Sequence, residues 1–262
     1  MEVLFLGTGA ADWPHETAAL GDSTATNRRC TSVLIDNTLL IDPGPDVPEA
    51  LAAFHVDPTQ ITTVLISHSH GDHYAASTLE FLSSVHPIDV YGDGGYPQKL
   101  PNNTNLRFHP LTLRHLTDTP AAQIIPVLST HVVEDTEENC LHYIIIRDGQ
   151  TVFYGPDGAW FGGGTWYELE KHHFDCMILD ATFGDDATKF RIPSRHIWFY
   201  HNSTSMIAAI RDACFDKKIA DDRTRFVANH LARGFYPDIE TAKAVFEPIG
   251  FIASYDGMRL SF

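Results

Sequence analysis

The amino-acid sequence predicts an α/β fold, a four-layered αββα sandwich in which two mixed β-sheets carry helices on their outer faces. Two observations lead to this prediction. Short apolar runs of strand length, bounded by glycine, proline, asparagine and aspartate, recur along the 262 residues. Amphipathic helical patterns fall between these runs in both halves of the chain. No internal repeat interrupts the pattern, so we expect one domain over residues 1–262.

The first strands follow from local pattern and turn chemistry. Residues 3–9, "VLFLGTG", predict a strand that runs into a glycine turn. Residues 31–42, "TSVLIDNTLLID", predict two short strands joined at Asp36 and Asn37, a favourable pair for a hairpin turn. The stretch from 12 to 29 lacks periodicity, and we expect a long loop there.

Two helices flank the next strand. Apolar residues at helical spacing predict a helix over 46–54, with Asp46 as its cap and Pro48 in the first turn, where a missing N–H does no harm. Residues 61–66, rich in β-branched side chains, predict a strand. The apolar spacing that follows predicts a second helix from residue 72 to about residue 84.

The second half repeats this alternation. A hairpin is expected over residues 141–157 around Asp148 and Gly149, followed by a strand over 174–183. A helix should begin at Ser203 or Thr204, and its buried face should consist of Met206, Ile207, Ile210 and Cys214. A short strand at 225–230 and a helix over about 239–246 complete the set.

Charge and hydropathy limit the classes of function. Acidic residues number 34 against 18 lysines and arginines, which gives a formal net charge of −16. Binding to a nucleic-acid backbone usually requires a basic face, so this balance argues against long polynucleotides. No apolar run approaches the roughly 18 residues that a membrane span needs. The start, "MEVLFLGTGA", has no basic residue and soon turns glycine-rich, so we expect a cytoplasmic protein.

The cysteines are scattered along the chain. Cys30, Cys140, Cys176 and Cys214 show no C-x-x-C spacing. This argues against both a disulfide framework and a zinc site built from cysteines, and it favours free thiols.

One short segment concentrates the residue types that bind metal ions. "LISHSHGDHYAAS" (65–77) places His68, His70, Asp72 and His73 directly after the predicted 61–66 strand. In an extended loop, His68 and His70 point to the same side and can reach one ion. Gly71 allows a tight turn, after which Asp72 and His73 can face a neighbouring point. Imidazole and carboxylate are ligands of zinc, manganese and iron, so we predict a metal site here.

The same motif carries a family resemblance. His-x-His-x-Asp-His after a strand, together with "FLGTGA" and "LLIDPGPD" upstream, resembles the metallo-β-lactamase superfamily over most of the chain. The resemblance implies the αββα fold, a hydrolase activity and a dinuclear site for two divalent ions, zinc or manganese. It further implies that His131 in "LSTHVVED", Asp157 in "YGPDGAW" and His230 in "VANHLARG" complete the ligand set.

The implied arrangement divides the ligands between two ions. His68, His70 and His131 would hold one ion, Asp72, His73 and His230 would hold the other, and Asp157 would bridge them. Two such cations lower the pKa of a shared water, so hydroxide is available near neutral pH as the nucleophile.

Two later segments narrow the resemblance to one branch. "ILDATFG" (178–184) and "YHNSTSMIAAI" (200–210) look like the paired loops of the tRNA 3′-processing endonucleases. "LGTGAADWP", "RRCTSVLID" and "YGPDG" are closer to the phosphoribosyl cyclic-phosphate phosphodiesterase. Both relatives imply His201 as the general acid, with Asp180 to orient it, and Asp72 completes our catalytic set. His196 is a rival for the acid role.

The sequence departs from both relatives. Residues 12–29 lack the cysteines of the structural zinc cluster that the phosphodiesterase carries in this loop. No long glycine-rich or basic insertion matches the tRNA-binding arm of the endonucleases. Five aromatic side chains near the expected mouth could instead wall a pocket or pack in the core: Trp13, Trp160, Phe161, Trp166 and Tyr167.

The favoured function is a dinuclear-metal phosphodiesterase acting on a small cyclic or ribosyl phosphodiester. The alternatives are a tRNA 3′-processing-type endoribonuclease and a lactone, thioester or β-lactam hydrolase with the same metal site. We expect a small phosphorylated substrate as the partner, without nucleic acid or membrane. The sequence does not decide the oligomeric state, and a homodimer is one option.

Overall fold

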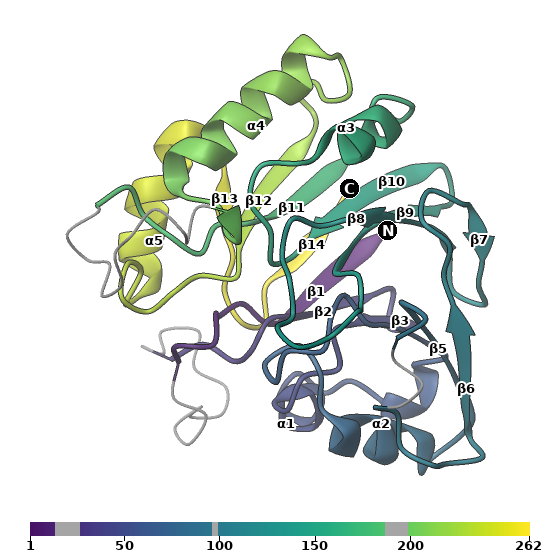
Figure 1. Ribbon diagram of the computed structural model, residues 1–262. Coiled ribbons are helices and arrows are strands. Elements are labelled where there is room, and N and C mark those ends of the chain that lie inside the picture. The colour runs from purple at the N-terminus through teal and green to yellow at the C-terminus, as the bar shows by residue number, and fades with distance from the viewer. Residues whose placement is uncertain (14–26, 96–98, 187–198) are drawn as a thin grey trace.

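Two seven-stranded β-sheets pack face to face in the computed structural model, which describes residues 1–13, 27–95, 99–186 and 199–262 (Figure 1). Strand order in the first sheet is β14-β1-β2-β3-β4-β5-β6. Its strands are β1 (Glu2–Gly7), β2 (Ser32–Ile35), β3 (Leu39–Ile41), β4 (Thr63–Leu65), β5 (Ile88–Gly92), β6 (Leu106–Pro110) and β14 (Arg259–Ser261).

The second sheet runs in the order β13-β12-β11-β10-β9-β8-β7. Its strands are β7 (Thr117–Asp118), β8 (Gln123–Leu128), β9 (Leu141–Arg147), β10 (Gln150–Gly155), β11 (Cys176–Asp180), β12 (Arg225–Asn229) and β13 (Ile252–Ala253). Both sheets are mixed: β3, β4, β5 and β6 pair in parallel, as do β10 to β13.

Helices cover the outer face of each sheet, which confirms the predicted four layers (Figure 1). The helices are α1 (Val47–Ala53), α2 (Ala76–Ser83), α3 (Gly163–Leu169), α4 (Thr204–Asp216) and α5 (Ile239–Phe246), with short 3₁₀ turns at Pro58–Gln60 and Glu247–Ile249. In Figure 1, α1 and α2 lie below the first sheet, and α3, α4 and α5 lie over the second.

The alternation of side chains along β1 explains the layering. Val3 and Phe5 face the second sheet and pack with residues such as Tyr154. Leu4 and Leu6 point the other way and pack with Leu51 of α1 and other residues of α1 and α2. Successive side chains of a strand point to opposite faces, so one strand supplies two separate cores.

Both predicted hairpins are present. Asp36 and Asn37 have φ values of 46° and 58° between β2 and β3, and Asp148 and Gly149 have values of 52° and 77° between β9 and β10. Aspartate, asparagine and glycine tolerate this left-handed backbone, so these residues fix the register of each hairpin.

Several local predictions need correction. The helix expected from residue 72 begins at Ala76, because the backbone N–H groups of His73 and Tyr74 both donate to His70 O in a preceding turn. Asp46 occupies the predicted cap position of α1, but its side chain makes no capping bond, and its Oδ2 instead accepts from Cys30 N at 2.8 Å.

The N-terminus of α4 is also capped differently from expectation. Ser203 occupies the cap position without a capping bond from its side chain. Asp185 instead accepts from the backbone N–H of Ser205 at 3.1 Å. Within the predicted buried face, Ile207, Ile210 and Cys214 are buried, while Met206 is half-buried.

The prediction left 88–128 without assigned elements, but these residues form β5 to β8. It also left out α3, β13 and β14. Of the loop expected over 12–29, residues 14–26 lie outside the described part of the chain. No helix within the described segments is both long and apolar enough to cross a membrane.

Candidate metal centre

The predicted ligands meet at the carboxyl ends of strands from both sheets. His68, His70, Asp72 and His73 follow β4 of the first sheet. His131 follows β8, Asp157 follows β10 and His230 follows β12, all in the second sheet. Strands that run in the same direction end at the same edge, so residues far apart in the sequence converge there.

Three histidines and one carboxylate oxygen form the first cluster. His70 Nδ1 lies 3.0 Å from His68 Nε2 and 3.0 Å from His131 Nε2. Asp157 Oδ2 lies 3.7 Å from each of those two Nε2 atoms. Ligand atoms around a tetrahedral zinc ion are roughly 3.3 Å apart, since each is about 2.0–2.1 Å from the metal. The four atoms therefore have the spacing of a metal site.

The other oxygen of Asp157 belongs to a second cluster. Asp157 Oδ1 lies 3.1 Å from both His73 Nε2 and His230 Nε2. Asp72 Oδ2 lies 3.5 Å from the same two nitrogens. In each cluster all candidate donor atoms lie within 4.8 Å of one another. Asp157 thus faces both clusters, one oxygen to each.

Two buried atoms test whether this donor set suits a metal ion. His73 Nε2 and Asp157 Oδ1 are buried without a hydrogen-bond partner. Buried polar atoms are rarely left unsatisfied, because their desolvation costs roughly 1–3 kcal/mol. A divalent cation would satisfy both atoms at once, so the residues fit a bound metal.

The outer ring nitrogens of the histidines are held by oxygen atoms. His73 Nδ1 donates to Asp42 Oδ2 at 2.9 Å, and His131 Nδ1 donates to Tyr200 O at 3.1 Å. Carboxylate and carbonyl oxygens can only accept, so the proton sits on Nδ1 and leaves Nε2 free to bind a metal.

A family model described as beta-lactamase superfamily domain matches residues 37–220. The chain belongs to the metallo-β-lactamase superfamily. The resemblance seen in the sequence is therefore confirmed.

Curated relatives match this chain over only part of its length. Ribonuclease Z of Lactobacillus gasseri is 29% identical over 107 residues, which is 37% of this chain and 32% of the relative. Ribonuclease Z of Methanothermobacter thermautotrophicus is 29% identical over 103 residues, which is 36% of this chain and 30% of the relative. The matched part thus spans about a third of the length of these relatives.

Solved structures share the metallo-β-lactamase fold over the whole chain. YhfI from Bacillus subtilis superposes with a TM-score of 0.73 at 20% identity, covering 99% of this chain and 98% of that one. A diphosphatase of the PhnP family has a TM-score of 0.70 at 18% identity, with coverage of 100% and 97%. Zn²⁺-bound PqqB from Methylobacterium extorquens has a TM-score of 0.75 at 16% identity and covers both chains fully. At these identities the likeness shows the fold alone.

The carboxylates of Asp157, Asp72 and Asp42 hold the pKa of His73 well above its usual value despite burial, but for two other candidate ligands burial sets the protonation. It lowers the pKa of His131 to about 4, against the opposing effect of Asp157. Burial likewise holds the pKa of His68 well below its usual value, with the neighbouring His73 adding to the effect. Both imidazoles are therefore neutral at pH 7, as metal binding requires.

His201 and Asp180 lie beside both clusters. His201 Nδ1 donates to Asp180 Oδ2 at 2.7 Å, and the His201 ring stacks on His230 at 5.4 Å between ring centroids. Burial lowers the pKa of His201, but Asp180, Asp157 and Asp72 raise it to about 8. The two segments that carry this pair also contact each other, since Phe183 N donates to Asn202 O. The rival His196 lies outside the described residues.

Two residues that the sequence did not single out connect these groups. Thr182 donates to Asp180 Oδ1 at 2.7 Å and lies 2.8 Å from His230 Nδ1, so it links the predicted pair to a ligand. Asp42 contacts His73 and also accepts from Ser67 N at 2.8 Å, which fixes the start of the histidine loop. Their positions at the ends of the predicted strand segments, in "ILDAT" and "LLIDPG", are the signal that could have found them.

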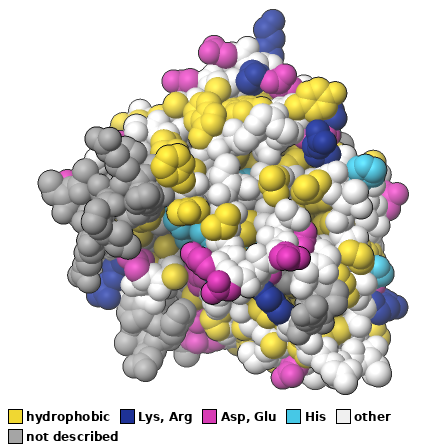
Figure 2. All heavy atoms as spheres, viewed as in Figure 1, with side chains coloured by type: hydrophobic (Ala, Val, Ile, Leu, Met, Phe, Trp, Pro, Cys, Tyr) yellow, Lys and Arg dark blue, Asp and Glu magenta, His cyan; other side chains and the backbone are white. Residues whose placement is uncertain are grey.

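A cavity of about 660 Å³ opens over the two clusters. Its described lining includes Phe183, Tyr200, Asp12 and Glu134, and the lining residues that the structure describes include no lysine or arginine. Figure 2 shows histidine atoms at the surface of this face, close to acidic and hydrophobic side chains.

The five aromatic residues considered earlier do not line this cavity. Trp13, Phe161 and Trp166 are buried, so core packing is the correct interpretation for them. Trp160 and Tyr167 are exposed elsewhere. Trp13 still supports the site, because its Nε1 donates to Leu231 O, next to His230, at 2.7 Å.

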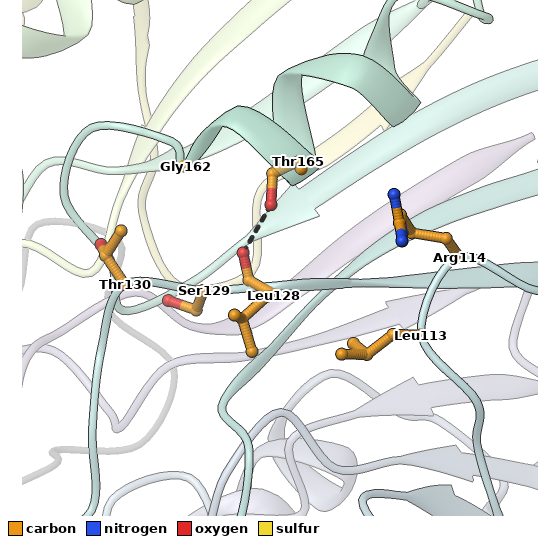
Figure 3. A pocket seen from close by; sticks show the side chains of 8 residues that line it. Leu113, Arg114, Leu128, Ser129, Thr130, Gly162 and Thr165 are labelled. Atoms are coloured by element: carbon orange, nitrogen blue, oxygen red, sulfur yellow. Dashed lines mark hydrogen bonds between the residues drawn. The ribbon is translucent and has the colours of Figure 1, made fainter.

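A second cavity, of about 260 Å³, lies beside α3 (Figure 3). It contains none of the candidate ligands. Thr165 of α3 donates to Leu128 O at 2.7 Å, so the helix is tied to the end of β8, three residues before His131.

Proposed function

We propose that this superfamily hydrolase is a dinuclear-metal phosphodiesterase. His68, His70 and His131 would hold one divalent ion, and Asp72, His73 and His230 the other. Zinc and manganese both suit this donor set. The observation that carries the proposal is the placement of Asp157, whose Oδ2 faces the first cluster and whose Oδ1 faces the second.

Two bound ions would supply an activated water and neutralise charge on the phosphoryl group. The residues of this chain then position the two ions and orient the histidines that bind them. Asp157 carries negative charge between the two cations and offsets their repulsion. Asp42 and Thr182 keep the Nδ1 protons of His73 and His230 in place, so that each Nε2 faces the reacting centre.

His201 is the proposed general acid. Its Nδ1 proton is engaged by Asp180, so the opposite nitrogen, Nε2, is the one that can deliver a proton to a leaving oxygen. His201 also lines the cavity, which brings it to the substrate side of the metal clusters. The carboxylate of Asp180 favours the imidazolium form that this role requires.

The cavity supports a small diester as substrate. A volume of about 660 Å³ suits a small ligand, and Phe183 and Tyr200 offer aromatic surface for a sugar or base. Asp12 and Glu134 add negative charge to the described lining beyond the candidate ligands, which favours a monoanionic diester over a polyanion. A cyclic or ribosyl phosphodiester meets both conditions.

Metal content measured together with hydrolysis of bis(p-nitrophenyl) phosphate tests this proposal. We expect two metal ions per chain and turnover that is restored by zinc or manganese after chelation. Asp157→Ala should lose at least one ion and the activity. Two ions without diesterase activity would contradict the substrate class and turn attention to lactones and thioesters. One ion or none would contradict the dinuclear centre.

Endoribonuclease activity is the second candidate, favoured by the sequence match to two ribonuclease Z proteins. Cleavage of a precursor tRNA at its 3′ end would support it. Hydrolysis of small ribosyl diesters, without cleavage of precursor tRNA, would support the phosphodiesterase instead.

A further inference from the structure

Glu138 lies behind the first metal cluster, in the connection between β8 and β9. Its side chain is only 1% exposed. Oε1 accepts from the backbone N–H of Ser69 at 2.9 Å and from the Ser69 hydroxyl at 2.7 Å. Oε2 pairs with Lys99 Nζ at 2.7 Å. Both oxygens of this buried carboxylate thus have specific partners.

Ser69 is the middle residue of the His-x-His segment. Side chains alternate along an extended backbone, so Ser69 points away from the side on which His68 and His70 meet. Glu138 therefore holds the histidine loop on the side opposite His68 and His70, through hydrogen bonds from both the backbone and the side chain of Ser69. Lys99 also donates to the Ser69 hydroxyl, which closes a three-membered network.

The position of Glu138 in the chain gives this grip a consequence for the metal. His131 belongs to the same β8–β9 connection, whereas His68 and His70 follow β4 in the other sheet. Glu138 thus ties the segment that supplies one ligand of the first cluster to the segment that supplies the other two. Leu141 N also donates to Ser67 O at 2.9 Å, so the same two segments are joined a second time at the start of β9.

We propose that Glu138 is a positioning residue that sets the spacing of His68, His70 and His131 and so the metal affinity of that cluster. This inference rests on the proposed metal-binding role of the three histidines. The second cluster should depend on Glu138 far less. Its ligand Asp157 follows β10, its ligand His230 follows β12, and His73 is fixed by Asp42.

The test separates the two clusters with background variants. His230→Ala weakens the second cluster and leaves the first, while His131→Ala does the reverse. Metal-free protein of each background is titrated with Zn²⁺ against a chromophoric chelator. Glu138→Ala should lower the Zn²⁺ affinity about tenfold or more in the His230→Ala background, the scale expected for lost support of ligands. In the His131→Ala background the change should stay below about twofold.

Two matched variants sharpen the result. Glu138→Gln keeps a carbonyl oxygen for Ser69 and should restore most of the affinity that Glu138→Ala loses. Glu137→Gln removes the same charge from an exposed neighbouring side chain and should leave both affinities unchanged. If Glu138→Ala does not fold, as judged by circular dichroism of the metal-free protein, Ser69→Ala replaces it with the same expected selectivity.

Equal losses in both backgrounds would overturn the proposal, because they would mean general destabilisation. Unchanged affinity in both would overturn it as well. Either result, obtained with a wild-type protein that binds two ions and hydrolyses diesters, would leave the proposed function intact. A wild-type protein that binds no Zn²⁺ would overturn the proposed function and this inference together.

Discussion

At the scale of single residues, the centre depends on which nitrogen each imidazole turns inward. His73, His131 and His230 present Nε2, whereas His70 presents Nδ1 and has its Nε2 3.5 Å from the exposed Glu134. His70 therefore has a longer outer contact than its cluster neighbours, since His131 Nδ1 donates to Tyr200 O at 3.1 Å and His68 Nδ1 lies 3.0 Å from Ser67 Oγ. The ring of His70 is thus the least constrained of the three, so its position should depend most on the hydrogen bonds between Glu138 and the adjacent Ser69.

Replacing His201 tests the acid role directly. His201→Ala should lower the rate on a diester with an alkyl alkoxide leaving group by about 10² or more, because such a group must be protonated as it departs. On bis(p-nitrophenyl) phosphate the loss should be much smaller, because nitrophenolate needs little protonation. Rate constants on both substrates, with metal content measured alongside, check this. Equal losses at unchanged metal content would contradict the assignment.

The first four ligands could be predicted from the sequence because they are local. His68, His70, Asp72 and His73 fall within six positions after a strand, so their spacing alone indicates a site. His131, Asp157 and His230 needed the family resemblance, because one isolated histidine or aspartate carries no such signal. Thr182, Asp42 and Glu138 were not predicted, since tertiary packing decides which oxygen meets each outer nitrogen or loop.

At the scale of elements, the predicted and observed structures agree where turn residues and alternating side chains give a local signal. Both hairpins were predictable because Asp36-Asn37 and Asp148-Gly149 adopt the left-handed backbone that such residues favour. The half-exposed edge strand β6 was not, because Leu106–Pro110 carries polar residues and ends in proline. The start of α2 was misplaced because the turn that begins at His70 takes up the residues before it.

At the same scale, Gly158 directly follows Asp157, the proposed bridging ligand. A Cβ at this residue would lie 2.6 Å from Ser129 Oγ and 2.8 Å from the His142 ring. Ser129 Oγ itself donates to Asp157 O at 2.6 Å. Gly158→Ala should therefore shift Asp157, reduce metal content, and destabilise the fold by about 1–3 kcal/mol, the usual cost of overpacking.

Gly162→Ala is the matched control, because nothing lies within 4 Å of a Cβ there. Thermal melting and metal analysis of both variants check the prediction. A Gly158→Ala protein with full metal content and an unchanged melting temperature would show that the turn after β10 adapts without cost.

At the scale of the whole molecule, the candidate metal centre lies at the seam between the two sheets. Its ligands come from β4 on one side and from β8, β10 and β12 on the other. Asp72, Asp157 and Asp180 are all buried near this seam. Burial alone would raise the pKa of each carboxyl, but the neighbouring histidines hold it below its usual value, so these carboxylates stay charged. Bound metal ions would act as cross-links that also neutralise this charge.

Removal of metal should therefore lower the melting temperature. Free metal at a thousand times its dissociation constant stabilises the native state by about 4 kcal/mol per site. For a chain of this size, each kcal/mol corresponds to roughly 2–4 °C, so chelation should lower the midpoint by about 10 °C or more. Differential scanning calorimetry before and after EDTA treatment, with zinc added back, measures this. An unchanged midpoint would mean that the two sheets are held without help from the centre.

The four buried thiols have a practical consequence for this chemistry. None of them forms a disulfide, and none belongs to either ligand cluster. Burial raises the pKa of Cys140 and of Cys214 to about 12 each, so these thiols stay protonated and unreactive near neutral pH. Oxidants and alkylating agents that strip zinc from thiolate sites have no target among these ligands. A metal ion held by these candidate ligands would therefore stay bound through changes in redox conditions that would empty a cysteine-bound centre.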